Sequence, residues 1–189
     1  ICIGMWGSAN FFDIKGVTES IAESLNTKFE YVRGTRPYLH PGITAEILCD
    51  GETVGVVGSV DPAVLESIAA ERPMVLAELD YELLKKHAKP FKYVPMPKFP
   101  EVQRDLALIA AADVTCGQIE KEICAACKYV SDVKLFDLYI GSQVGEGKKS
   151  MAYSLTFTPR DEAFTGEKID GFVKKILSNL RFKLGVELR

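Results

Sequence analysis

The sequence predicts an α+β fold in which an antiparallel-sheet domain precedes a ferredoxin-like domain of order β-α-β-β-α-β. The prediction rests first on the runs KLFDLYIG and KKSMAYSLTFTP, residues 134–141 and 148–159, which alternate apolar and polar side chains as half-buried strands do. The residues between them, 142–147, include glycines and are too few for a crossover helix, so the two strands form an antiparallel hairpin. Helical patterns on both sides of the hairpin complete the order.

Length and composition indicate a globular protein. The chain has 189 residues, of which 47% are hydrophobic, enough for one large or two small domains with real cores. It contains neither an apolar run of ~20 residues nor a signal-peptide pattern, so we expect a soluble, cytoplasmic protein. Because it begins with Ile1 inside an apparent strand, we expect a C-terminal piece of a longer chain. The five cysteines, an odd number, indicate reduced thiols rather than disulfides.

Charge divides unevenly along the chain. Residues 1–94 carry 9 basic and 13 acidic side chains, a net of -4, whereas residues 95–189 carry 14 and 13, a net of +1. The total of -3 is too small to steer any partner strongly. Charge alone would not suggest a nucleic acid.

The first domain, expected over residues 1–88, opens with a strand in ICIGMW. Apolar residues then recur at helical spacing, which predicts an amphipathic helix over residues 15–25. A short strand over 29–32 follows, and GTRPYLHPG, residues 34–42, is predicted to be a loop because of its prolines and glycines.

The rest of this domain alternates strands and short helices. Asp50-Gly51 supplies the turn of a hairpin, and Asp61 and Asp80 each cap a helix. The predicted elements are strands 43–49 and 53–60, a helix from Pro62 to about residue 70, a strand over 74–79 and a helix ending near residue 87.

The stretch KKHAKPFKYVPMPKFP, residues 85–100, is rich in prolines and lysines and has almost no periodicity. We therefore predict an interdomain linker over residues 89–100. Its lysines either contact a phosphate backbone or are solvated.

The second domain, residues 101–189, shows regular patterns. Residues 104–110 form a strand, and Thr115 with Gln118 forms a capping box at the start of a helix. The buried stripe of that helix is predicted to be Cys116, Ile119, Ile123, Ala126 and Val130. After the hairpin come a second helix over 165–184, ended by Gly185, and a last strand over 186–188. Both helices cover one face of the sheet and leave the other face open.

That open face could hold unpaired RNA bases. One side of its third strand carries only small residues, Ser150, Ala152, Ser154 and Thr156, and near its edge Tyr139 offers a ring and Lys148 and Lys149 offer positive charge. The common RNA-recognition motif places stacking aromatics on the two central strands. Here those positions are Ala107, Ala152 and Ser154, so any RNA contact uses Tyr139 together with backbone and small polar groups.

Two other groups of residues could have either a chemical or a purely structural role. Cys124-x-x-Cys127 could bind zinc or form a redox disulfide, but it has no second Cys or His pair nearby, and a structural role is favoured. His40 beside Arg36 suggests an anion or acyl-adenylate site, although a hydrogen-bonded loop histidine is commoner. We predict no catalytic residues, no metal ligands and no cofactor bound by this chain.

The runs FPEVQRDLALI, LFDLYIG and KSMAYSLTF resemble the ferredoxin-fold anticodon-binding domain of bacterial phenylalanyl-tRNA synthetase beta subunits. Upstream, ANFFDIKGVTESI, YLHPG and ETVGVVGSVDPAVLE resemble the preceding region of the same subunit, the second half of a noncatalytic class II synthetase-like module. The resemblance covers essentially the whole chain.

The resemblance implies specific roles. Tyr139 matches the aromatic residue that stacks on an anticodon base of tRNA(Phe), and Ser150 matches a hydroxyl that meets another base. Arg104 and Asp105 match an R-D-L strand of framework or contact residues. An alpha subunit binds phenylalanine and ATP with Mg2+, in a heterotetramer of two alpha and two beta subunits. The loop over 142–147 and the pair Tyr153-Ser154 depart from the family's pattern.

Three functions remain open from the sequence. The leading one is a noncatalytic portion of phenylalanine-tRNA ligase, an aminoacyl-tRNA synthetase, that binds tRNA and supports subunit assembly. The second is a ferredoxin-like regulatory domain that binds a small molecule such as an amino acid. The third is a protein-interaction fragment, which predicts an exposed apolar patch within residues 1–90.

Overall fold

The computed structural model describes residues 1–93, 95–160 and 162–189, apart from the side chain at position 142. The chain folds as two compact units, residues 1–93 and 94–189. Each unit has its own sheet and its own hydrophobic core. Among the described residues, every helix is too short or too polar to span a bilayer.

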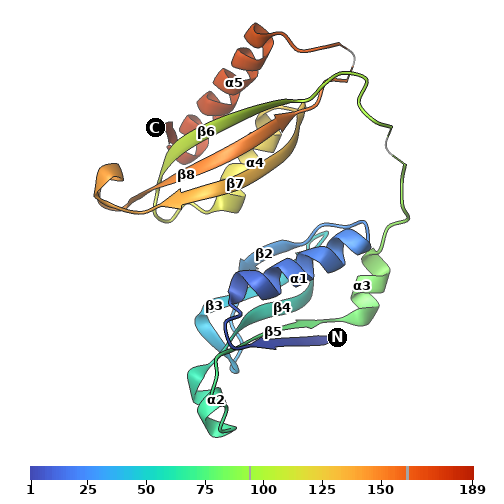
Figure 1. Ribbon diagram of the computed structural model, residues 1–189, viewed down its shortest axis with the longest axis vertical. Coiled ribbons are helices and arrows are strands. Elements are labelled where there is room, and N and C mark those ends of the chain that lie inside the picture. The colour runs from blue at the N-terminus through green and yellow to red at the C-terminus, as the bar shows by residue number, and fades with distance from the viewer. Residues whose placement is uncertain (94, 161) are drawn as a thin grey trace. The chain divides into compact units, whose positions relative to one another are not determined.

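The first unit is built on a five-stranded sheet of order β1-β5-β4-β3-β2, in which all neighbouring strands are antiparallel. Its elements are β1 Cys2–Trp6, α1 Phe11–Ser24, β2 Glu30–Arg33, β3 Leu39–Cys49, β4 Glu52–Val60, α2 Pro62–Ser67, β5 Met74–Leu79 and α3 Tyr81–His87. Helix α1 lies across one face of this sheet (Figure 1) and buries Ile14, Thr18 and Ala22. The predicted 43–60 hairpin is confirmed as β3 and β4.

Helix α1 begins at Phe11, so the predicted start at residue 15 was wrong. The Asn10 side chain accepts a hydrogen bond from the Phe12 N–H at 2.7 Å, and the Asp13 carboxylate accepts one from the Asn10 N–H at 2.7 Å. This reciprocal pair forms a capping box, which satisfies backbone donors at the helix start. The helix therefore begins four residues earlier than the apolar spacing predicted.

Strand β3 begins at Leu39, inside the segment that was predicted to be a loop. Leu39 pairs with Val60, and the register then shifts before Thr44 pairs with Gly58. Such a bulge leaves extra residues out of the ladder, so a proline is tolerated there. Helix α2 also differs from the prediction, because it ends at Ser67 rather than near residue 70.

The segment after α3 stays attached to the first unit at its beginning. The Lys89 N–H donates to the Leu25 carbonyl at 2.9 Å, and the Asn26 amide donates to the Lys89 carbonyl at 3.2 Å. Residue 94 of the predicted linker lies outside the described residues. Phe91, Tyr93 and Met96 are all strongly exposed.

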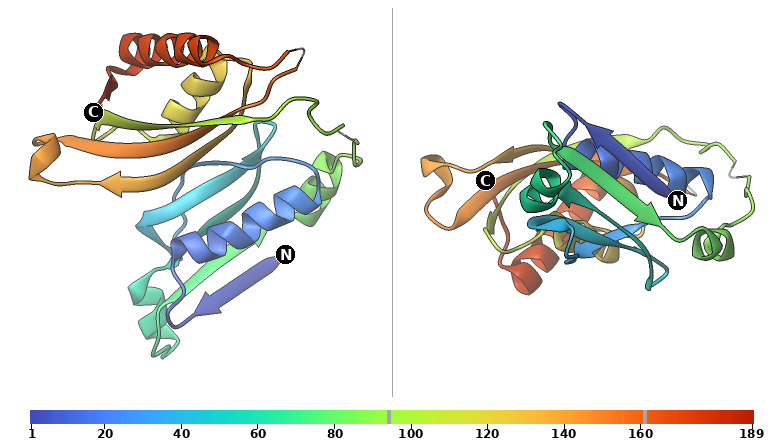
Figure 2. Two further views of the ribbon diagram at one scale, coloured as in Figure 1. Left: turned by 45° about the horizontal axis from the view of Figure 1, so that its top comes forward. Right: turned by 90° about the horizontal axis from the view of Figure 1, so that it is seen from below.

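The second unit has the order β-α-β-β-α-β and a four-stranded sheet of order β7-β8-β6-β9, with all neighbours antiparallel. Its elements are β6 Val102–Ala111, α4 Cys116–Ala126, β7 Val130–Tyr139, the 3-10 turn Ser142–Val144, β8 Lys148–Phe157, α5 Gly166–Leu184 and β9 Glu187–Leu188. Both helices lie on the same side of the sheet (Figure 2). The predicted ferredoxin-like topology is confirmed.

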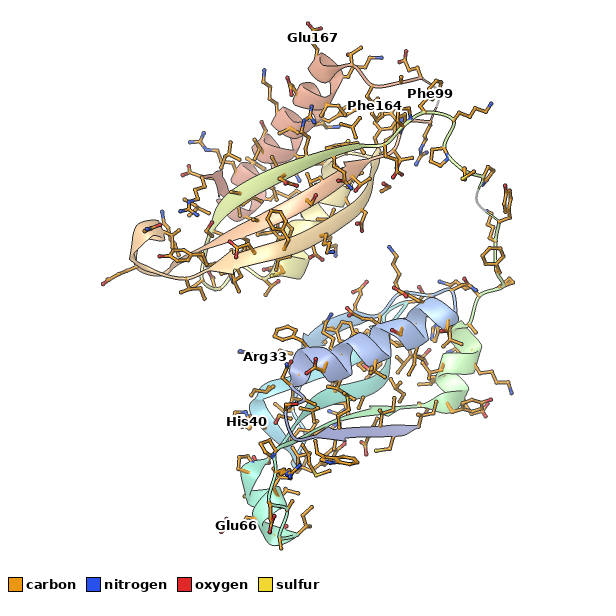
Figure 3. All side chains as sticks on the ribbon, viewed as in Figure 1. Arg33, His40, Glu66, Phe99, Phe164 and Glu167 are labelled. Atoms are coloured by element: carbon orange, nitrogen blue, oxygen red, sulfur yellow. The ribbon has the colours of Figure 1, made fainter. Side chains whose placement is uncertain are left out.

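The core of this unit lies between the sheet and the two helices. Alternate residues of β8, Met151, Tyr153, Leu155 and Phe157, are all fully buried there, and burial raises the pKa of the Tyr153 hydroxyl. Phe164, which precedes α5 (Figure 3), packs its ring 5.3 Å from that of Phe172. Val130 was predicted to extend the stripe of α4 but instead begins β7, because the helix ends at Ala126.

Strand β7 forms one edge of the sheet and is irregular. Its register against β8 shifts between Val130 and Asp132 and again between Leu135 and Asp137. Phe136, at the second bulge, is 55% exposed. The other edge strand, β9, has only two residues.

A polar cluster joins α4 to α5. The Glu122 carboxylate accepts hydrogen bonds from the Lys183 ammonium and from the Asn179 amide, with Nζ and Nδ2 at 2.9 and 2.8 Å from Oε2. These donors stabilise the ionised carboxylate, so the pKa of Glu122 is lowered. A carboxyl group whose pKa is lower in the folded state than in the unfolded state stabilises the fold at pH values above its unfolded-state pKa. This stabilisation is lost as the pH falls through the folded-state pKa.

We therefore expect Glu122→Gln to reduce the acid dependence of the second unit's stability. Wild type and variant should differ in free energy of unfolding at neutral pH and converge below the folded-state pKa of Glu122. Hydrogen exchange of α4 and α5 peptides across an acid series measures this difference. Glu167→Gln, which alters a carboxylate in the first turn of α5, is the control. A constant gap at every pH would show that Glu122 contributes through packing alone.

Candidate nucleic-acid interface

Four cross-strand rows lie on the sheet face opposite α4 and α5, and three of them contain predicted site residues. The first row is Tyr139, Ser150 and Ile109; the second is Asp137, Ala152 and Ala107; the third is Lys134, Ser154 and Asp105. Each row runs from β7 through β8 to β6. We call these nine residues the open face. In the second and third rows its two central strands carry only small or short side chains, so a ligand can come close to the sheet backbone there.

Tyr139 stands at the β7 end of the first row and is half-buried. Its hydroxyl and ring lie against Gly141, where a Cβ atom would come within 2.5 Å of Tyr139 Oη and 2.7 Å of Cζ. The guanidinium carbon of Arg189 lies 6.0 Å from the centre of the ring, at the outer limit of a cation–π contact. Arg189 also approaches Gln143, with Nη2 3.4 Å from Oε1.

Arg189 reaches this position because the backbone continues beside β6 after β9. Its N–H donates to the Ala107 carbonyl at 2.8 Å. The structure thus brings together Tyr139, Gly141 and Arg189, of which the sequence analysis identified only Tyr139. Strand alternation past residue 188 was the one signal that could have indicated Arg189.

Ser150 is the cross-strand neighbour of Tyr139, and it is only 4% exposed. Ala152 and Ser154, further along β8, are half-buried. In the free protein, Ser154 is therefore more accessible than Ser150.

Four of the predicted site residues are charged, and they divide between the two faces. Asp105 lies on the open face, and Lys148 pairs with Ala111 on the same side of β8 as Ser150. Arg104 pairs with Leu155, and Lys149 pairs with Ala110, so both lie on the side of the core residues. The Lys149 ammonium donates to the Ala112 carbonyl at 2.9 Å, and the Arg104 guanidinium donates to the Gln103 carbonyl at 3.0 Å.

The open face mixes charges of both signs. Asp105 and Asp137 are exposed carboxylates, and Lys134 is an exposed ammonium in the row with Asp105. Carboxylates repel phosphates but accept hydrogen bonds from the amino and imino groups of bases. This arrangement is therefore better suited to reading exposed bases than to gripping a phosphate backbone.

The residues singled out in other places have ordinary structural partners. His40, on β3 (Figure 3), accepts a hydrogen bond at Nδ1 from the Gly42 N–H at 3.0 Å. The Arg36 guanidinium pairs with the Glu46 carboxylate at 2.8 Å. Because these bonds occupy both side chains, Arg36 and His40 do not together form a ready anion site.

The two cysteines of the Cys124-x-x-Cys127 motif lie in different surroundings. Cys127 is buried in the core of the second unit, whereas Cys124 is exposed on α4.

Comparisons with known proteins agree with both units. Residues 2–81 match the model of the phenylalanyl tRNA synthetase beta chain CLM domain, and residues 97–189 match that of the ferredoxin-fold anticodon binding domain. The phenylalanine-tRNA ligase beta subunit of Clostridium tetani is 38% identical over 193 residues, covering 100% of this chain and 24% of that protein. The Bacillus subtilis beta subunit is 37% identical over 175 residues, covering 90% and 22%.

The chain spans about a quarter of the length of these curated relatives. The two family models match adjacent segments that together take in nearly all of it. Their order along the chain follows the order of the two folded units. The chain therefore belongs to the family of phenylalanyl-tRNA synthetase beta chains.

Proposed function

We propose that the second unit binds the anticodon loop of tRNA(Phe), and that the chain is part of a cytoplasmic phenylalanine-tRNA ligase. The observation that carries this proposal is the open face: low central strands bounded at one end by the half-exposed ring of Tyr139. The description of the model matched by residues 97–189 and the names of the relatives support it. The same description favours RNA over a free amino acid as the ligand.

In this proposal the open face reads unpaired bases by stacking and by hydrogen bonds. The Tyr139 ring stacks on one anticodon base, since an aromatic face accepts any base. The hydroxyls of Ser154 and Ser150 and the carboxylate of Asp105 contact base edges. Ser150 is only 4% exposed, so Ser154 offers the more accessible hydroxyl of the two. Small side chains at Ala107 and Ala152 let the bases approach the sheet.

The basic residues have different parts in the proposal. Lys148 extends from the Ser150 side of β8 and contacts a phosphate. Arg104 and Lys149 lie on the other side of the sheet, so we assign them to holding the strand ends in place. Few phosphate contacts imply a shallow salt dependence, since each one contributes about -0.7 to the slope of log K against log salt for a single strand.

The first unit is proposed to support assembly with an alpha subunit, in a tetramer of two alpha and two beta chains. A depression of about 690 Å³ on this unit is lined mainly by apolar side chains, among them Phe11, Phe12, Ile43 and Val75. Phe12 is 77% exposed there. ATP and Mg2+ are assigned to the alpha subunit. Arg36 and His40 do not together fit an adenylate, because Arg36 is paired with Glu46 and His40 with the Gly42 N–H.

Tyr139→Ala is expected to weaken binding of a tRNA(Phe) anticodon stem-loop by about 1–3 kcal/mol, the contribution of one stacked base. Fluorescence anisotropy with the labelled stem-loop measures the affinity of this chain at several salt concentrations. Tyr139→Phe keeps the ring and should bind nearly as well as wild type. Tyr81→Ala removes a tyrosine of the first unit, 60% exposed, and is the control for the loss of a surface ring elsewhere in the chain.

A stem-loop with an altered anticodon should bind wild type more weakly, because base-edge hydrogen bonds are lost, but Tyr139→Ala should weaken its binding about as much as that of the cognate stem-loop, because the ring stacks on any base. Equal affinity of wild type and Tyr139→Ala for the cognate stem-loop would show that the open face is not the RNA site. If the chain bound neither stem-loop and free phenylalanine raised its melting temperature, the regulatory-domain alternative would be supported.

A further inference from the structure

Three potential metal ligands meet where the β3–β4 turn approaches the end of α3. Cys49 is the last residue of β3, Asp50 begins the turn, and His87 is the last residue of α3. One ligand atom from each, a sulfur, a carboxylate oxygen and an imidazole nitrogen, lie within 4.8 Å of one another. Asp50 and Gly51 both have positive φ, at 50° and 84°, as the two central residues of a type I′ hairpin turn do.

The hydrogen bonds of His87 favour a metal-binding orientation. Nε2 lies 2.8 Å from Glu52 Oε2, and Nδ1 lies 3.5 Å from Asp50 Oδ2. A histidine that binds a metal commonly donates its other ring N–H to a carboxylate, which fixes the tautomer and the ring plane. With its proton on Nε2, His87 presents the Nδ1 lone pair toward Asp50 and Cys49.

The sulfur is also suitably placed. Cys49 is fully buried, and the Thr27 hydroxyl lies 3.1 Å from its Sγ, near enough to donate to a thiolate. The His87 side chain is 12% exposed and that of Asp50 is 54% exposed. The group is thus closed on the protein side and open to solvent at Asp50, as in zinc sites with three protein ligands and a water.

We propose that Cys49, Asp50 and His87 bind a thiophilic divalent cation such as Zn2+, with Glu52 orienting His87. On binding, the Cys49 thiol gives up its proton to solvent and sulfur becomes the ligand. Lys89, whose ammonium lies 2.9 Å from Asp50, must release that carboxylate. Lys86, 2.6 Å from Glu52, stays with the orienting carboxylate.

A bound ion would tie the β3–β4 turn to the end of α3. Two residues further on, the Lys89 backbone already bonds to Leu25. The metal therefore fixes the point at which the chain leaves the first unit. None of its residues belongs to the open face.

Co2+ is the spectroscopic probe, used on the untagged, reduced chain after chelator treatment and dialysis. We expect a sulfur-to-cobalt charge-transfer band that saturates at one ion per chain and is abolished by Zn2+. Because a proton is released, the apparent affinity should rise with pH. Zn2+ should also raise the melting temperature of the first unit, as any ligand of the folded state does.

Variants test each assigned role. Cys49→Ser should remove the charge-transfer band, and His87→Ala should weaken Zn2+ binding more than Glu52→Gln does. Glu52→Gln should weaken it by about 10–100-fold, as outer-shell changes do. Cys2→Ser, at an exposed cysteine, and His40→Ala are the controls and should bind as wild type does.

The absence of a Cys49-dependent band, or equal Zn2+ affinity in His87→Ala and wild type, would overturn the proposal and leave an ion-pair network with the two lysines. If Cys49→Ser fails to fold, His87→Ala and Glu52→Gln still decide the question through Zn2+ affinity. Their circular dichroism must match that of wild type for this comparison to count.

Discussion

Replacing Phe157 by alanine is expected to lower the free energy of unfolding of the second unit by about 3–5 kcal/mol. Phe157 is fully buried at the end of β8, and its ring stacks on that of Phe172 with centroids 6.0 Å apart. Removing the ring takes away its transfer free energy and leaves a cavity among residues that relax only partly. Hydrogen exchange of β6 and β8 peptides reports the change.

Phe182→Ala is the matched control, because Phe182 is 90% exposed on α5 and the same atoms are removed. Its effect should stay within about 0.5 kcal/mol. Phe157→Ala should weaken RNA binding only under conditions in which the unit unfolds, whereas Tyr139→Ala should weaken binding with the stability unchanged. A Phe157→Ala protein as stable as wild type would show that the core is not packed as described.

Gly55→Ala is expected to destabilise the first unit by about 1–3 kcal/mol, the usual range for overpacking. Gly55 lies in β4 opposite Leu79, and a Cβ there would come within 2.2 Å of the Glu78 carbonyl oxygen and 2.7 Å of Leu79 Cδ2. A carbonyl oxygen belongs to the backbone, so relief of this clash requires β5 to move. Urea denaturation followed by the fluorescence of Trp6, the single tryptophan of the chain, measures the loss.

Gly4→Ala makes the same change in β1 of the same sheet, where a Cβ would have nothing within 4 Å. Because alanine restricts the unfolded chain more than glycine does, this variant should be as stable as wild type or slightly more stable. The contrast isolates the close approach of β4 and β5. A destabilisation equal in both variants would assign the effect to strand alanines in general.

Local sequence patterns predicted much of the fold because helix caps and strand alternation depend only on residues that are close in sequence. Thr115 and Gln118 identified the start of α4, and the bonds between them are present at 2.8 Å and 3.3 Å. Gly185 adopts a φ of 63° and ends α5 as predicted. The alternation along β8 correctly separated buried Met151 from the small residues of the open face.

The errors arose where tertiary context outweighed a local pattern. Asn10 and Asp13 cap α1 reciprocally, and Phe11 continues the apolar stripe three residues before Ile14, but the adjacent Phe12, which is exposed, obscures the helical spacing. Pro41 suggested a loop, yet pairing of Leu39 with Val60 brings that segment into β3. Val130 continued the helical spacing of α4 but lies in the next strand.

The face on which a site residue lies was predictable only where the two-residue alternation of a β-strand was taken into account. It places the adjacent lysines Lys148 and Lys149 on opposite sides of β8, although the sequence analysis treated them as one cluster. Other groupings join distant parts of the chain. Arg189 reaches the Tyr139 ring across the sheet, and His87 meets Cys49, 38 positions earlier at the end of β3, which spacing alone does not reveal.

The two bulges of β7 and the shortness of β9 have a consequence for self-association. A regular, exposed edge strand presents unpaired N–H and C=O groups that recruit a strand from another molecule. Here one edge is interrupted at Asp132 and Asp137, each carrying a carboxylate, and the other edge is only two residues long. Neither edge thus offers a long, regular ladder of unpaired backbone groups, which disfavours edge-to-edge pairing with a second copy of the sheet.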